Sequence, residues 1–188
     1  GGDPIRTWVL AHNEWTFAPE QHLTLAAFVL PNHPIVTRLA IGGALPAGRT
    51  IEPCEVLDAI YRHIHDDWKI AYAYEPPHYE SSSQKVRLPH QVITEFAGRH
   101  GRGTCLDLAV LLAGCLEHLH RQPMVAVVDL GTTLHAIIGC RKSAAQGQEA
   151  IMVDPGLLVE DAEWLDPNGC TTDPKQRKSL EQARFAAQ

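Results

Sequence analysis

One stretch of the sequence, GRGTCLDLAVLLAGCL at residues 101–116, constrains the fold more than any other. Read as a helix, it carries one apolar stripe and is apolar over most of its remaining surface as well. The stripe consists of Leu108, Leu111, Leu112, Cys115 and Leu119, and the remaining surface carries Ala109, Val110, Ala113 and Leu116. A helix that is apolar on nearly every side has to lie at the centre of a domain. We therefore expect a central helix that runs from Cys105 to about residue 120, with Cys105 in its first turn.

A cysteine at the start of a helix has a chemical environment that a cysteine in the middle lacks. The positive end of the helix dipole and the unpaired N–H groups of the first turn both favour a thiolate, which is the nucleophilic form. The same N–H groups can stabilise an oxyanion on an attacked carbonyl. Gly101 and Gly103 are expected to let the preceding loop bend and to bring a substrate close to the backbone. Cys115 lies on the core stripe and is expected to be a packing residue.

A nucleophilic cysteine needs a base, and the base needs a group that orients it. His135 enters an apolar strand in TTLHAIIGC, and Asp154 ends the next one in IMVDPG, so a hairpin could bring the two together. Asp166, in EWLDPNGCT, is the alternative, and it follows the acidic segment VEDAE, which is a poor strand pattern. We expect the order Cys105, His135, Asp154, and Asp166 stays open as the third member.

Two further polar residues are candidates for oxyanion or substrate contacts. Gln84, in a serine-rich loop before a helix, could donate its side-chain amide to an oxyanion or could simply order the loop. Thr104 is interpreted as the N-cap of the central helix in preference to a catalytic group. No metal is expected, because His63 and His65 stand two apart on a helix and cannot chelate together. No cofactor is expected either.

The remaining pattern predicts an α+β fold, with helices first and an antiparallel sheet afterwards. Residues 1–50 are expected to form a β-rich segment or accessory subdomain, and residues 51–188 the main domain. The expected strands are 7–17, 23–31, 123–131, 133–142 and 149–156, the expected helices 54–68 and 88–101, and 34–45 is open between the two.

Composition narrows the classes of partner. The formal charge of −6 over 188 residues argues against nucleic acid, and no apolar run approaches the length of a membrane span. Five cysteines without a Cys-x-x-Cys pair fit free thiols in a reducing cytosol. The opening Gly-Gly-Asp-Pro reads like mid-protein sequence, so we expect a segment of a longer protein.

Residues 55–188 resemble the transglutaminase-like superfamily of papain-fold cysteine enzymes. The resemblance lies in the order of four features: a GTC turn that opens a helix, a strand, an HA pair that opens a strand, and a DP pair that closes one. The segment YEPPHYESSSQKVRLPHQVI, followed by GTCLDLAVLLAGCLEHL, is similar to a bacterial branch often fused to other modules, including helicase-like and defence-associated ones. The sequence departs from the family at Leu106 and Ala136, where tryptophan is frequent.

The resemblance implies that Cys105 attacks an amide carbonyl, that His135 acts as general base and then acid, and that the aspartate orients His135. It implies a helix that carries the cysteine at its N-terminus, packed on an antiparallel sheet. We expect a cytoplasmic cysteine hydrolase, a protease module of a larger bacterial protein, with a protein or peptide substrate and the other domains of that protein as partners. A transglutaminase or deamidase with the same triad, and an inactive papain-like interaction module, are the alternatives.

Overall fold

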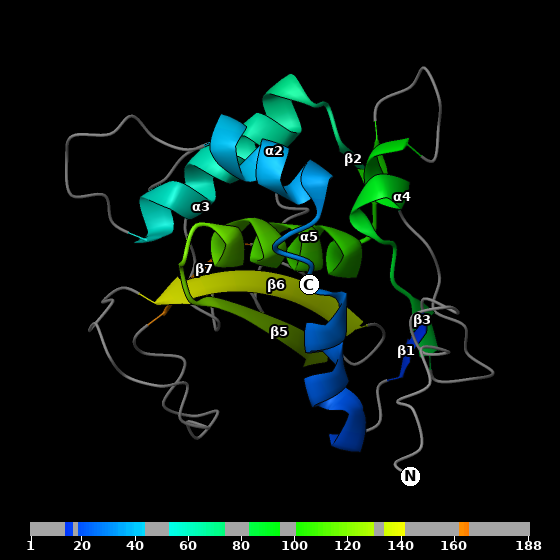
Figure 1. The fold of residues 1–188 in the computed structure, drawn as a ribbon. Helices are drawn as coiled ribbons and strands as arrows, with labels where there is room; N and C mark the ends of the chain where they lie inside the picture. The colour runs from blue at the N-terminus through cyan, green and yellow to red at the C-terminus, as the bar shows by residue number, and fades with distance from the viewer. Residues whose placement is uncertain are drawn as a thin grey trace, which may run out of the picture.

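The fold is organised around one helix that lies between a sheet and two other helices (Figure 1). The structure is a computed structural model that describes residues 14–16, 19–43, 53–73, 83–94, 101–129, 134–141 and 162–165. Helix α5 (Cys105–His118) lies on the sheet, and α2 (Pro34–Gly42) and α3 (Pro53–Arg62) cover its other side. The fold is therefore of the α+β class, as the sequence predicts.

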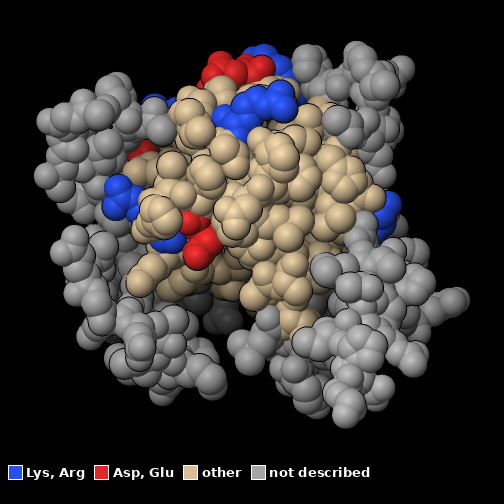
Figure 2. Space-filling view, viewed as in Figure 1, with Lys and Arg blue, Asp and Glu red and all other residues tan. Residues whose placement is uncertain are grey.

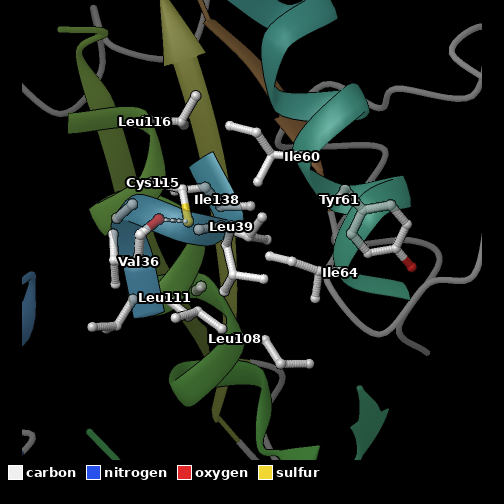
Figure 3. Packing of buried hydrophobic residues seen from close by; sticks show 14 of the residues in the cluster. Val36, Leu39, Ile60, Tyr61, Ile64, Leu108, Leu111, Cys115, Leu116 and Ile138 are labelled. Carbon is white, nitrogen blue, oxygen red and sulfur yellow. Dashed lines mark hydrogen bonds between the residues drawn. The ribbon is translucent and has the colours of Figure 1, made fainter. Parts of the chain in front are cut away.

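The central position of α5 is confirmed by its burial. Every residue from Cys105 to Leu116 is buried. Figure 3 shows Val36 and Leu39 of α2 and Ile60 of α3 packed around α5, with Ile138 of the sheet nearby. Apolar partners on several sides satisfy a helix that has no polar face.

The sheet consists of three antiparallel strands in the order β5, β6, β7. Strand β5 spans Pro123–Asp129 and β6 spans Leu134–Arg141, so both strands predicted here are confirmed. Strand β7, Ala162–Leu165, overlaps the segment whose acidic sequence was expected not to form a strand, and that expectation is wrong. Pairing with β6 decides the conformation there, because strand preference depends on neighbours more than on intrinsic propensity. The strand expected at 149–156 lies outside the described residues.

The helices on the other side of α5 agree with the sequence pattern. Helix α3 continues into a π-helical turn, η2 (His63–Asp67), so the helix predicted over 54–68 is confirmed. The open segment 34–45 contains α2, which has His33 as its N-cap and Pro34 in its first turn. Helix α4 (Pro89–Thr94) begins the second predicted helix, whose residues 95–100 lie outside the described ones.

The described residues among the first fifty agree with expectation only in part. The strand predicted over 23–31 is wrong, because Pro19–Phe28 forms a 3₁₀ helix, η1. Leu25 and Phe28 are three residues apart, which is one turn of a 3₁₀ helix, and both are buried. Strand β1 (Glu14–Thr16) falls within the strand expected at 7–17. Residues of η1 and α2 belong to the same apolar cluster as α5, so this part of the chain contributes to the central core.

Two short strand pairs flank the start of α5. Strand β1 pairs antiparallel with β3 (Ser83–Lys85), and β2 (Ala71–Tyr72) pairs parallel with β4 (Arg102–Gly103), directly before the helix. Within the described ranges, no helix has both the length and the apolar character that crossing a bilayer requires.

Candidate active site

Cys105 is the first residue of α5, and a capping box holds the first turn of this helix. The Thr104 hydroxyl accepts a hydrogen bond from the Asp107 backbone N–H at 3.3 Å. The Asp107 carboxylate accepts one from the Thr104 backbone N–H at 2.8 Å. This reciprocal capping box confirms Thr104 as the N-cap and fixes the conformation of the turn that carries the thiol.

The cysteines of the central core differ in exposure. Cys105 retains 7% of its surface, whereas Cys115 and Cys140 retain none. The Cys115 thiol donates a hydrogen bond to the Val36 carbonyl oxygen (Figure 3), and burial raises the pKa of this thiol to about 12. Cys115 is therefore a packing residue, and Cys105 is the better candidate for a nucleophile. The side chains of Cys54 and Cys170 lie outside the described residues.

The two glycines before Cys105 are tightly packed and take part in backbone hydrogen bonds. Gly101 and Gly103 accept backbone hydrogen bonds from Ala71 and Ala73 at 2.8 and 2.7 Å. A Cβ on Gly101 would lie 2.4 Å from the Val92 carbonyl oxygen, and one on Gly103 would lie 2.9 Å from the Asp107 Cβ. The space in which a Cβ would stand is filled by protein, so close packing accounts for both glycines, and the approach of a substrate to their backbone stays a prediction.

Gln84 lies beside the start of α5. It sits in β3, where it pairs with Trp15 of β1. Its side-chain amide donates to the Thr104 hydroxyl at 3.3 Å, across twenty residues of sequence. Because Thr104 directly precedes Cys105, this bond links Gln84 to the residue before Cys105 and orders the chain there.

A buried ion pair next to the site was not foreseen from the sequence. The Arg87 guanidinium donates to the Asp107 carboxylate at 2.8 Å, and the two side chains are 6% and 0% exposed. Burial raises the pKa of the Asp107 carboxyl, while hydrogen bonds from Arg87 and Thr104 and the charge of Arg87 oppose that rise. The spacing Thr-x-x-Asp before an apolar run is a helix-start signal that could have identified Asp107. Nothing in the sequence indicates Arg87 as its partner.

The topology brings His135 to the end of the sheet at which Cys105 lies. Only residues 119–122 separate α5 from β5, so β5 begins near the C-terminal end of the helix. The fourteen residues of α5 rise about 21 Å, and the seven of β5 span about 23 Å, so β5 returns to the level of Cys105. Strand β6 starts there, because Asp129 pairs with Leu134 and Val128 with His135 (Figure 1).

The burial of its neighbours shows on which face of β6 His135 lies. Ala136, Ile138 and Cys140 belong to the apolar cluster that packs around α5. Side chains alternate along a strand, so His135, which is half-buried, lies on the opposite face of β6. An approach of His135 to Cys105 therefore passes around the end of the sheet and not through the packed face.

Both candidate aspartates lie outside the described residues, Asp154 in 142–161 and Asp166 in 166–188. Strand β7, which ends directly before Asp166, is described, and its register on β6 is known. Leu165 pairs with Ile138, three positions along β6 from His135. Asp166 is the next residue in the sequence after this pair.

The histidines near η2 are engaged separately and do not form a joint site. His63 Nδ1 contacts the Asp67 carboxylate at 2.6 Å, and its Nε2 accepts a hydrogen bond from the Trp68 indole at 3.0 Å. His65 contacts Asp66 at 2.8 Å. In the described part of the chain, no group of three or more histidine, cysteine or acidic residues is arranged to hold a metal ion.

No family model, no curated protein and no solved structure matches this chain. The site itself consists of a thiol at the start of a buried helix, backbone N–H groups, a side-chain amide, and a histidine at the same end of the sheet.

Proposed function

We propose that this chain is a cysteine hydrolase of the transglutaminase-like, papain-fold type, with Cys105 as nucleophile. One observation carries the proposal: Cys105 begins the central helix, and it alone among the three cysteines whose side chains are described keeps exposed surface. A thiol at this position lies beside the unpaired backbone N–H groups of the first helical turn, which can donate to an oxyanion.

The reaction proceeds through two tetrahedral intermediates. His135 takes the proton of the Cys105 thiol, the sulfur forms a bond to the carbonyl carbon, and the carbonyl π electrons move to oxygen. When the intermediate collapses, the C–N bond breaks and His135 returns the proton to the leaving amine. Water then attacks the thioester, with its proton passing to His135, and the C–S bond breaks to release the acid and the thiol. In a transglutaminase, an amine replaces water in this second half.

The third member of the triad would orient His135 and stabilise its protonated form. The sequence pattern favours Asp154 because it ends the strand expected at 149–156, one hairpin from His135, and because the segment before Asp166 is a poor strand pattern. Strand β7 removes the second of these reasons, since it pairs with β6 and ends at the residue before Asp166. We therefore favour Asp166 for this role and keep Asp154 as the alternative.

The substrate class and setting belong to the same proposal. We propose a protein or peptide substrate and a cytoplasmic module of a larger bacterial protein, whose other domains would be its partners. On the face drawn in Figure 2, the described Lys and Arg side chains lie in small separate groups and do not merge into one basic patch. A face on which a few charged groups of both signs lie among uncharged residues suits a polypeptide better than a polyanion.

An inactive interaction module is the second candidate, and the position of His135 favours it. If His135 stays on the face of β6 that is opposite to α5, it cannot take the proton of Cys105. The scaffold would then hold a partner without doing chemistry.

Acylation by p-nitrophenyl acetate separates the two candidates. We expect a burst of p-nitrophenolate and one acetyl group on Cys105, located by peptide mass mapping. The Cys105→Ala variant should lose the burst, while Cys115→Ala, the matched control on the same helix, should keep it. A burst of equal size in Cys105→Ala would overturn the nucleophile. Absence of a burst in the wild-type protein would favour the inactive module.

A further inference from the structure

Three hydrogen bonds converge on the buried carboxylate of Asp107. The Arg87 backbone N–H donates to Oδ1 at 2.7 Å, and the Arg87 guanidinium donates to Oδ2 at 2.8 Å. The Thr104 backbone N–H donates to Oδ2 at 2.8 Å. Only the last of these bonds is needed to cap α5, so the two bonds from Arg87 do something that helix capping does not require.

The bonds from Arg87 fix a second piece of chain against the first turn of α5. Because Arg87 donates through its backbone as well as its side chain, Asp107 holds the main chain of this segment and not merely the tip of a side chain. Three residues earlier, Gln84 is paired with β1. The segment 84–87 is therefore held at both ends, and between them the Gln84 amide reaches the residue that precedes Cys105.

Stability alone does not explain a buried ion pair at this place. Removing two charges from water costs about as much as their attraction returns, and apolar residues of the same volume often serve stability as well or better. What a buried pair with several fixed hydrogen bonds adds is a defined geometry. The geometry defined here is that of the Gln84 amide relative to the start of α5.

We propose that Arg87 and Asp107 are positioning residues for an oxyanion site in which Gln84 is a donor. This inference rests on the proposed function. The Gln84 amide has two N–H groups. One donates to the Thr104 hydroxyl, and the other is the donor to the oxygen that becomes negative when the Cys105 sulfur attacks a carbonyl. The ion pair keeps the amide at this place without itself touching the substrate.

Two small electrophiles separate this role from a general effect on the thiol. Iodoacetamide alkylates a thiolate by displacing iodide at a saturated carbon, and no oxyanion forms. p-Nitrophenyl acetate is attacked at its carbonyl, where the new C–S bond places a negative charge on oxygen before p-nitrophenolate leaves. A loss of oxyanion stabilisation slows the second reaction and leaves the first unchanged.

The variants are Gln84→Ala and the paired change Arg87→Met with Asp107→Asn, which leaves neither charge buried alone. Each should slow acetylation of Cys105 by about 10²-fold, with alkylation by iodoacetamide within about two-fold of wild type. Combining them should cause no further loss, since the pair acts through Gln84. Arg87→Lys, which keeps the charge but not the planar fork, should show a smaller loss in acetylation alone.

Thermal unfolding is recorded for every variant, and Gln84→Ala and Arg87→Lys provide the test if the paired change prevents folding. Equal loss in both reactions, or losses that multiply when the changes are combined, would overturn the positioning role. Unchanged acetylation in Gln84→Ala would overturn Gln84 as a donor. If wild-type Cys105 is not acetylated, the proposed function itself fails, and this result is distinct from the others.

Discussion

The Cys115 thiol donates a hydrogen bond to the carbonyl oxygen of Val36 at 3.8 Å, which joins the middle of α5 to α2 (Figure 3). Neither residue is exposed. Ten residues earlier on the same helix, Cys105 keeps part of its surface. One helix thus carries a fully buried cysteine and a cysteine that keeps some exposed surface, and the difference lies in position along the helix.

Replacement of Cys115 should affect stability and not chemistry. Cys115→Ala removes a fully buried sulfur and its hydrogen bond, and we expect the free energy of unfolding to fall by about 1–2 kcal/mol. Urea denaturation measures this. Because the pKa of this thiol is about 12, Cys115 should not react with iodoacetamide near neutral pH in the folded protein. Cys105→Ala is the matched control and should cost less stability, since a small residue is tolerated at a helix start.

The two candidate aspartates can be separated by substitution. Asp166→Asn should lower the rate of amide hydrolysis or acyl transfer by orders of magnitude, because an amide cannot stabilise the protonated imidazole of His135. Asp154→Asn, the paired control, should remain within a few-fold of wild type. Single-turnover acylation of Cys105 in both variants checks this. The reverse result would assign the orienting role to Asp154.

Alanine substitutions at Gly101 and Gly114 should change the stability of the fold in opposite directions. Gly101→Ala would place a methyl group 2.4 Å from the Val92 carbonyl oxygen, so the backbone has to move, and a loss of about 1–3 kcal/mol in stability is expected. In Gly114→Ala, within α5, the nearest atom is a methyl group of Val36 at 3.4 Å. The higher helix propensity of alanine should raise stability there by about 0.5–1 kcal/mol. Urea midpoints measured side by side test the pair, and equal effects would contradict it.

His33 should make the fold less stable in mild acid. Its Nδ1 accepts the Ile35 backbone N–H at 3.2 Å as the N-cap of α2, and its ring stacks on His90. Burial first, and then the charge of His90, lowers the pKa of His33 below 6.5. The unfolded chain therefore binds this proton first as the pH falls, so stability is complete above about pH 6.5 and declines below it.

His33→Asn keeps an N-cap acceptor and removes the titration. The loss of stability from about pH 7.5 to about pH 5.5 should be smaller in this variant than in wild type, as measured by urea denaturation at each pH. His33→Ala removes the cap and should lower stability at both pH values. An unchanged pH dependence in His33→Asn would show that another group is responsible.

The parts of the fold that the sequence predicts are those fixed by local pattern. Residues 105–116 are apolar on nearly every side, and a central helix buries them. Strands β5 and β6 are long, apolar and joined by a short connection, so their pairing follows as well. The N-cap role of Thr104 needs only its own turn of chain.

The parts that the sequence does not predict depend on distant partners. Residues 23–28 have strand-like composition, yet Leu25 and Phe28 reach the core from a 3₁₀ helix. The acidic segment before Asp166 becomes a strand because an edge of β6 is available to it. The bond between Arg87 and Asp107 joins two segments twenty residues apart, and no spacing rule connects them.

The order of α5, β5 and β6 along the chain has a consequence for how the site assembles during folding. These three elements occupy one run of sequence, and their contacts close only short loops, which form quickly. The pairing of β1 with β3, which carries Gln84, has to join residues about seventy positions apart, and its closure entropy is larger. We therefore expect hydrogen-exchange protection to reach α5 before it reaches β3. The Cys105 thiol would be in place early, and the strand that carries Gln84 would form later.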